Sequence, residues 1–98
     1  MAIIAVPASR VIEVVRECQV AGIPSMTIYT SGFAEMGGAG EQLEAELKEI
    51  AEAEGTLVCG PNCQGVANLH DRMVANFSST LSRDDITAGP IGFVSQSG

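Results

Sequence analysis

Short apolar runs alternate with two amphipathic stretches along the first sixty residues. Residues 2–6 form a continuous apolar run ended by Pro7, which is typical of a strand buried on both faces. Further runs at residues 25–30 and 56–59 predict a second and a third strand. The intervals between these runs are long enough to hold one helix each.

Two helices are predicted in those intervals. Ser9 can cap the first helix, in which apolar residues recur at helical spacing until Gly22 closes it. The second helix is predicted from Gly40 to Glu54, with one apolar and one densely charged face, and Gly55 stops it. Strand, helix, strand, helix and strand at this spacing indicate right-handed crossovers. The expected fold class is therefore α/β, a partial doubly wound, Rossmann-like parallel sheet.

The regular alternation ends after the third strand. Residues 65–88 show mixed polarity, with one short strand predicted at residues 73–77, and are typical of a functional loop or a connection between domains. Residues 89–94 then predict a new buried strand that runs into the small residues 95–98. Because such a strand normally leads into a helix, and because Met1 lies directly against the first strand, we expect both ends to be cuts in a longer protein.

Composition and charge narrow the classes of function. The chain of 98 residues is 46% hydrophobic, and its 12 acidic residues against 5 basic ones give a net charge of −7. Its one lysine and four arginines are scattered. We therefore expect no binding to nucleic acid or to an anionic membrane, since both need clustered positive charge. No apolar run reaches the length needed to cross a bilayer.

The three cysteines cannot all be paired within the chain. Free thiols in a cytoplasmic protein are the simplest interpretation of Cys18, Cys59 and Cys63. Cys59, Cys63 and His70 can be considered as zinc ligands, but C-x3-C is an unusual spacing and a fourth ligand is missing. A nucleophilic role for Cys63 would need a neighbouring base, and the sequence shows none nearby. We therefore predict packing cysteines, a surface histidine and no metal site.

Four segments follow the predicted strands, at the edge where parallel sheets bind ligands. They are residues 7–9 (P-A-S), 29–32 (Y-T-S-G), 60–63 (G-P-N-C) and 95–98 (S-Q-S-G). Their glycines, prolines and small hydroxyl residues let backbone amides approach a ligand, although tight turns favour the same residues. The glycines at 37–40 lack the lysine of a phosphate-binding loop and predict a flexible lead into the second helix.

Taken in order, the motifs V-P-A, T-S-G-F-A-E, G-P-N-C-Q-G-V and G-P-I-G-F-V-S-Q-S-G resemble the CoA-binding region of the NDP-forming acyl-CoA synthetases. This superfamily includes the ADP-forming acetyl-CoA synthetases and the α subunit of succinyl-CoA synthetase, and the turn at residues 31–35 suits the acetyl-CoA branch better. The resemblance implies that residues 1–88 are the second half of a CoA-binding domain. Residues 89–98 would then be the first strand and turn of a following flavodoxin-like ligase domain.

The resemblance also implies roles for individual residues. Eight of them would contact CoA: Pro7, Ala8, Tyr29, Thr30, Ser31, Gly32, Asn62 and Cys63. The first two would line its nucleotide end, and the last two would lie near its pantetheine thiol. Ser97 and Gly98 would begin a helix whose free amides hold a phosphate. No residue of this chain is assigned a catalytic role.

The resemblance implies that the parent protein is an acid–CoA ligase. The acid would be activated as an acyl phosphate, CoA would displace the phosphate, and a histidine elsewhere would relay the phosphoryl group to or from the nucleotide. Its partners would be a carboxylic acid, an ATP-grasp domain or subunit, and ATP/ADP or GTP/GDP with Mg²⁺, which this segment alone would not bind. Sheet edges left exposed by the cuts would favour self-association through strand pairing, so an oligomer is expected.

Three alternatives to the ligase interpretation remain open at this point. The segment could be a CoA-binding module of a protein lysine acetyltransferase, a stand-alone CoA-binding regulatory protein, or an α/β domain without activity. Neither the acid nor the choice between ADP and GDP follows from the sequence.

Overall fold

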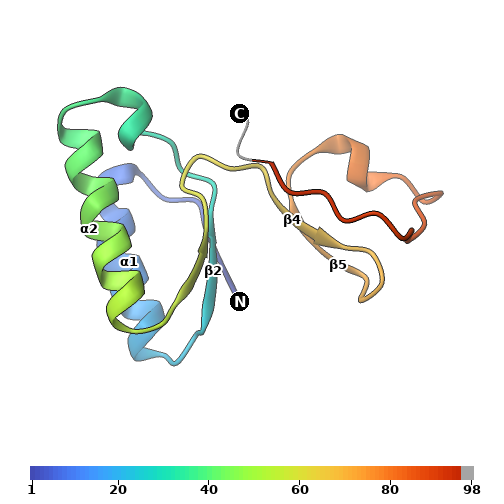
Figure 1. Cartoon of the computed structure of the whole chain (residues 1–98), viewed down its shortest axis with the longest axis horizontal. Coiled ribbons are helices and arrows are strands. Elements are labelled where there is room, and N and C mark those ends of the chain that lie inside the picture. The colour runs from blue at the N-terminus through green and yellow to red at the C-terminus, as the bar shows by residue number, and fades with distance from the viewer. Residues whose placement is uncertain (96–98) are drawn as a thin grey trace.

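The computed structural model describes residues 1–95 as a parallel sheet with two helices, followed by a hairpin (Figure 1). The first part comprises β1 (Ala2–Ile4), α1 (Ala8–Val20), β2 (Ser25–Ile28), the short 3-10 helix η1 (Ala34–Met36), α2 (Ala39–Ala53) and β3 (Leu57–Cys59). The second part comprises β4 (Gly65–Asn68), β5 (Met73–Asn76) and the 3-10 helix η2 (Ser79–Ser82). The α/β class with a parallel sheet, predicted from the sequence, is confirmed.

The three parallel strands lie in the order β1-β2-β3, and both helices cover the same face of the sheet (Figure 1). The two crossovers move in the same direction across the sheet, so right-handed connections place α1 and α2 side by side. The strands and helices meet in one core. Its buried members are Ile4, Val11, Val15, Met26, Ile28, Phe33 and Leu47.

Neither of the two helices covers the opposite face of the sheet (Figure 1). Ile3 in β1, opposite Thr27, is 52% exposed, and Leu57 in β3, opposite Ser25, is 72% exposed, although Thr27 in the central strand is buried. The prediction that the first strand is buried on both faces is therefore wrong for β1. A second layer of helices arises only where the strand order reverses, and these three strands progress in one direction.

The start of α1 differs from the sequence expectation. The N-cap position is held by Pro7, and no side chain among residues 1–95 caps the helix. The predicted capping role of Ser9 is wrong, because Ser9 already lies in the first turn of α1. Pro7 has an extended backbone that points the chain into the helix, and its carbonyl oxygen accepts the amide hydrogen of Arg10 at 2.8 Å.

Both helices end in a Schellman motif, as their glycines suggest. After α1, Gly22 adopts φ +72° and the amide of Ile23 donates to the carbonyl of Cys18 at 2.9 Å. After α2, Gly55 adopts φ +64° and the amide of Thr56 donates to the carbonyl of Ala51 at 2.8 Å. The two helix ends predicted from glycine are thus confirmed.

A β-hairpin follows the parallel sheet. β4 and β5 pair antiparallel, with Gly65 opposite Asn76. β5 corresponds to the strand predicted at residues 73–77, whereas β4 was not predicted because its sequence G-V-A-N is short and mostly small. Gly65 is required there, since at its φ of +109° a side chain would overlap with the carbonyl oxygen of Ala75.

Residues 83–95 are irregular, and the strand predicted at residues 89–94 does not form. Ile91 and Phe93 are each 87% exposed. An apolar run becomes a strand only when a neighbouring strand accepts its hydrogen bonds, and residues 89–94 have no such neighbour among residues 1–95. Ser97 and Gly98, with the predicted turn, lie outside the described residues. Within residues 1–95, none of the helices has the length and apolar character needed to span a membrane.

Candidate functional site

The loops that follow β1, β2 and β3 are joined by hydrogen bonds at the carboxyl edge of the sheet. The hydroxyl of Thr30 donates to the carbonyl oxygen of Val6 at 2.7 Å. The carbonyl oxygen of the same Thr30 accepts the amide hydrogen of Asn62 at 2.9 Å. Thr30 is half-buried, so these bonds are partly shielded from water. One residue thereby connects all three loops in which CoA contacts were predicted.

The first two loops also touch directly. Gly32 adopts φ +106°, and a side-chain carbon at this position would lie 3.1 Å from the Cβ atom of Ala8. Pro7 is exposed at the start of α1, and Ala8 is the first residue of the helix. The structure thus brings together the predicted residues of the first loop and those of the second.

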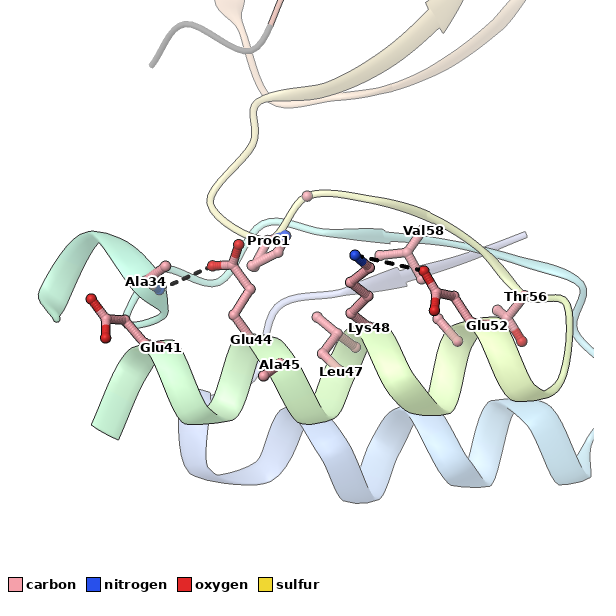
Figure 2. A pocket seen from close by; sticks show the side chains of 12 residues that line it. Ala34, Glu41, Glu44, Ala45, Leu47, Lys48, Glu52, Thr56, Val58 and Pro61 are labelled. Atoms are coloured by element: carbon pink, nitrogen blue, oxygen red, sulfur yellow. Dashed lines mark hydrogen bonds and ion pairs between the residues drawn. The ribbon is translucent and has the colours of Figure 1, made fainter. Parts of the chain in front are cut away.

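Three consecutive amides in the loop after β2 donate to the carboxylates of Glu35 and Glu44. The amides of Gly32 and Phe33 donate to Glu35 at 2.5 and 3.2 Å. The amide of Ala34 donates to Glu44 of α2 at 3.0 Å, as Figure 2 shows. An anion therefore does not find these amides free, and since the Thr30 hydroxyl already donates to Val6, the loop presents the exposed hydroxyl of Ser31 instead.

Glu35 has a lowered pKa, so the loop should respond to acid. The hydrogen bond from the Gly32 amide is the main cause, and those from the amides of Glu35 and Phe33 add to it, so the pKa lies below its ordinary value of 4.5. A lowered pKa stabilises the folded loop above pH 4.5, and this contribution is lost as the pH falls through the folded-state value. We expect the Gly32 and Phe33 amide resonances to titrate with a midpoint below pH 4.5. In Glu35→Gln this titration should disappear; its persistence would contradict the assignment.

The loop after β3 is held by Gly60, whose backbone has φ +102°. A side chain at this position would overlap with the carbonyl oxygen of Ile28, so only glycine allows β3 to turn this close to β2. The Gly60–Pro61 peptide is cis, and Asn62 has φ +52°. This turn places the amide of Asn62 against Thr30 and the sulfur of Cys63 3.4 Å from the Ile28 carbonyl.

A separate groove of about 500 Å³ lies between α2 and β3 (Figure 2). Its polar lining is mostly acidic, with Glu41, Glu44 and Glu52 against the single cation Lys48, which pairs with Glu52 at 3.8 Å. None of the eight predicted CoA contacts lines it. A ligand with several phosphates is repelled by this charge, so the carboxyl edge is the better candidate site.

Two residues beside the site, Phe77 and Glu35, were not predicted from the sequence. Tyr29 packs its ring edge-on against Phe77, with centroids 5.0 Å apart, which fastens the hairpin segment to the end of β2. Phe77 lies 48 positions away in the chain, and no local pattern indicates this contact. The role of Glu35 could have been suspected from the sequence, because Glu35 follows Gly32 by only three positions in the same turn.

His70, predicted to be a surface residue, is exposed in the hairpin loop, with Nε2 3.1 Å from the Gly89 carbonyl.

The chain is similar to known proteins along its length. Residues 1–68 match the family described as the CoA binding domain. The α subunit of acetate–CoA ligase (ADP-forming) II of Pyrococcus furiosus is 39% identical over 98 residues, which are 100% of this chain and 20% of that protein. Acetate–CoA ligase (ADP-forming) II of Archaeoglobus fulgidus is 41% identical over 98 residues, with 100% and 14% covered.

A solved structure shows the same architecture. The dinucleotide-forming acetyl-coenzyme A synthetase 1 of Candidatus Korarchaeum cryptofilum, determined with phosphate and ADP, superposes with a TM-score of 0.70 at 38% identity. The match covers 76% of this chain and 16% of that one. The chain thus spans about a fifth or less of the length of these relatives.

Proposed function

We propose, from the premise that this chain belongs to the family of CoA-binding domains, that it forms one side of the CoA site in an NDP-forming acyl-CoA synthetase. The observation that carries the proposal is the junction of the three carboxyl-edge loops through Thr30, which bonds to Val6 and Asn62. The similar proteins are named as ligases and synthetases of CoA esters, which favours this function over an acetyltransferase module or a regulatory protein.

The eight residues predicted from the resemblance have distinct tasks in this proposal. Pro7 and Ala8 receive the nucleotide end of CoA, where the uncapped N-terminus of α1 favours phosphate. The stretch from Tyr29 to Gly32 lines the middle of the site. Asn62 and Cys63 lie beside the pantetheine thiol, the group that accepts the acyl chain. Because the amide of Gly32 is already bonded to Glu35, the polar contacts of this stretch come from hydroxyl groups.

The rest of the reaction belongs to the proposed parent protein. A carboxylic acid becomes an acyl phosphate, CoA displaces the phosphate, and a histidine on another domain relays the phosphoryl group. The names of the relatives support ADP as the nucleotide product; ATP, Mg²⁺ and an ATP-grasp domain or subunit complete the proposal. Residues 89–98 begin the following domain, and Ser97 and Gly98 bind its phosphate.

Two further properties are proposed, one of the parent protein and one of this chain by itself. A cytoplasmic location of the parent protein agrees with three free cysteines. Association of this chain into an oligomer agrees with the outer edges of β1 and β3, which pair with no strand among residues 1–95.

An NMR titration of the 98-residue chain with CoA tests the site. We expect amide shifts at Thr30, Ser31, Asn62 and Cys63 that saturate with CoA, while the amide of Lys48 in the acidic groove stays unchanged. Desulfo-CoA should reproduce the shifts except at the last two residues, because it lacks the thiol. Unchanged spectra at millimolar CoA, or shifts confined to the groove, would contradict the proposal.

A pair of charge variants makes the test specific. Ser31→Asp places a carboxylate at the proposed site, and Ser79→Asp places the same group on η2; both serines are exposed. The first variant should weaken CoA binding about tenfold, equivalent to about 1.4 kcal/mol, through repulsion of the phosphates, and the second should leave it unchanged. Equal affinities of the two variants for CoA would show that the CoA phosphates do not lie near Ser31.

A further inference from the structure

Two free thiols lie together at the end of β3. The sulfur atoms of Cys59 and Cys63 are 3.9 Å apart, and neither is part of a disulfide. A disulfide requires about 2.05 Å between the sulfurs, so they need to approach by about 1.9 Å. Both cysteines are half-buried, and rotation about their side-chain bonds is the movement by which the sulfurs would approach.

The backbone already holds the two cysteines in this arrangement. The turn between them is fastened by the bond from the Asn62 amide to Thr30 and by the close approach of Gly60 to Ile28. The sulfur of Cys63 lies 3.5 Å from the carbonyl oxygen of Cys59 itself. A side chain at position 60 would also press on this sulfur, at 3.1 Å. The folded turn therefore keeps the thiols near each other, which favours reaction within the chain over reaction between chains.

The surroundings of Cys59 disfavour its thiolate. Burial is the main cause of the raised pKa of Cys59, and the hydrogen bond and charge of Cys63 add to it. A raised pKa lowers the fraction of Cys59 that is thiolate, so exchange at this residue should become faster as the pH rises.

We propose that Cys59 and Cys63 are a site of reversible oxidation, forming an intramolecular disulfide by exchange with a small-molecule disulfide. In the first step one cysteine thiolate attacks the reagent RSSR, giving a protein–SR mixed disulfide and releasing RS⁻. In the second step the other cysteine loses its proton and attacks the protein sulfur of the mixed disulfide, releasing a second RS⁻. Two cysteine thiols are oxidised, one RSSR is reduced to two RSH, and two protons pass from the cysteines to the released thiolates.

The short span of the bridge makes this disulfide readily reducible. Only three residues separate the cysteines, so the closed loop removes little entropy from the unfolded chain. Disulfides of this kind open and close with the ratio of reduced to oxidised small-molecule thiol around them, rather than acting as permanent cross-links. The proposal concerns the thiols alone and does not depend on whether the chain binds CoA.

The test is a redox titration of the folded chain in mixtures of reduced and oxidised glutathione, quenched with acid and alkylated under denaturing conditions for mass spectrometry. At oxidising ratios, we expect two of the three free cysteines to escape alkylation, with the loss of two hydrogen atoms per chain. A peptide map should locate the bridge between Cys59 and Cys63. Excess reduced glutathione should restore all three alkylatable thiols.

Single serine variants provide the controls. Cys18 lies on α1 against the core, so Cys18→Ser should form the same bridge with the same midpoint. Cys59→Ser should instead accumulate a glutathione mixed disulfide on Cys63, because the resolving thiol is gone. The proposal is overturned if the wild-type chain keeps three alkylatable thiols at every ratio, or if it forms only mixed or interchain disulfides. The two cysteines would then be packing side chains.

Discussion

Replacing Phe33 by alanine is expected to lower the free energy of unfolding by about 3–5 kcal/mol. Phe33 lies in the loop between β2 and η1, yet its side chain is fully buried in the core shared by the sheet and both helices. The backbone around it cannot collapse into the vacated space, because Gly40 of α2 already sits against the Phe33 carbonyl so closely that a side chain there would overlap with it. Urea unfolding followed by far-ultraviolet circular dichroism measures the loss.

The matched control is Phe93→Ala. Phe93 is 87% exposed, so removing the same ring should change the free energy of unfolding by no more than about 0.5 kcal/mol. If Phe33→Ala is too unstable for a folded baseline, Phe33→Leu retains part of the apolar volume and should show a smaller loss of the same sign. Equal losses for the two alanine variants would show that the ring of Phe33 is not a core residue.

Replacing Gly60 by alanine is expected to cost about 2–4 kcal/mol and to break the junction of the three carboxyl-edge loops. One part of the cost comes from the backbone, since φ +102° is unfavourable for alanine. The other part comes from the overlap of the new methyl group with the Ile28 carbonyl, which forces β3 away from β2. The amide resonances of Thr30 and Asn62 report this displacement, and urea unfolding gives its free energy.

Gly22→Ala separates the two contributions. Gly22 also has a positive φ, +72°, but apart from its two chain neighbours no residue of the described chain has an atom within 4 Å of the position of its missing Cβ. We expect a loss of about 1–2 kcal/mol from backbone strain alone, with the carboxyl edge unchanged. The interpretation of Gly60 fails if Gly22→Ala costs as much or if Gly60→Ala leaves the Asn62 amide in place.

Phe33 and Gly60 stabilise adjacent parts of the carboxyl edge of the sheet. Phe33 anchors the loop after β2 to the core, and Gly60 brings the loop after β3 against β2. Between them, Thr30 bonds to both neighbouring loops. A carboxyl edge built in this way is held by contacts on both sides of β2. This rigidity agrees with the proposed task of presenting CoA at a fixed position.

Elements with strong local patterns were predicted well. The two helices, the three parallel strands and the two glycine stops all appear within a few residues of their expected positions. These features depend on helical or strand periodicity and on residues such as Gly22 and Gly55 that end a helix by their own conformation. Elements that depend on a partner were predicted poorly. β4 was missed, and residues 89–94 were predicted as a strand although they have no neighbour to pair with within residues 1–95.

The candidate site was likewise predicted only in part from the sequence. The loops at the carboxyl edge follow from strand order, so their residues could be named from sequence motifs. Their individual contacts with CoA stay a prediction. The bonds that join the loops, from Thr30 to Val6 and from Asn62 to Thr30, connect residues 24 and 32 positions apart. The periodicity of hydrophobic residues gives no information on contacts between residues so far apart in the chain.

The sequence by itself determined the α/β class, the order of the three parallel strands and two α-helices, and the family resemblance, because these follow from short-range pattern and from motifs in the turns. Only the tertiary structure decided which face of the sheet is covered, that Phe33 belongs to the core, and that Cys59 and Cys63 lie within reach of each other. The physical reason is that burial and contact depend on how separate segments pack. A local pattern favours a helix or a strand, but it contains no information on which distant side chain fills the space beside it.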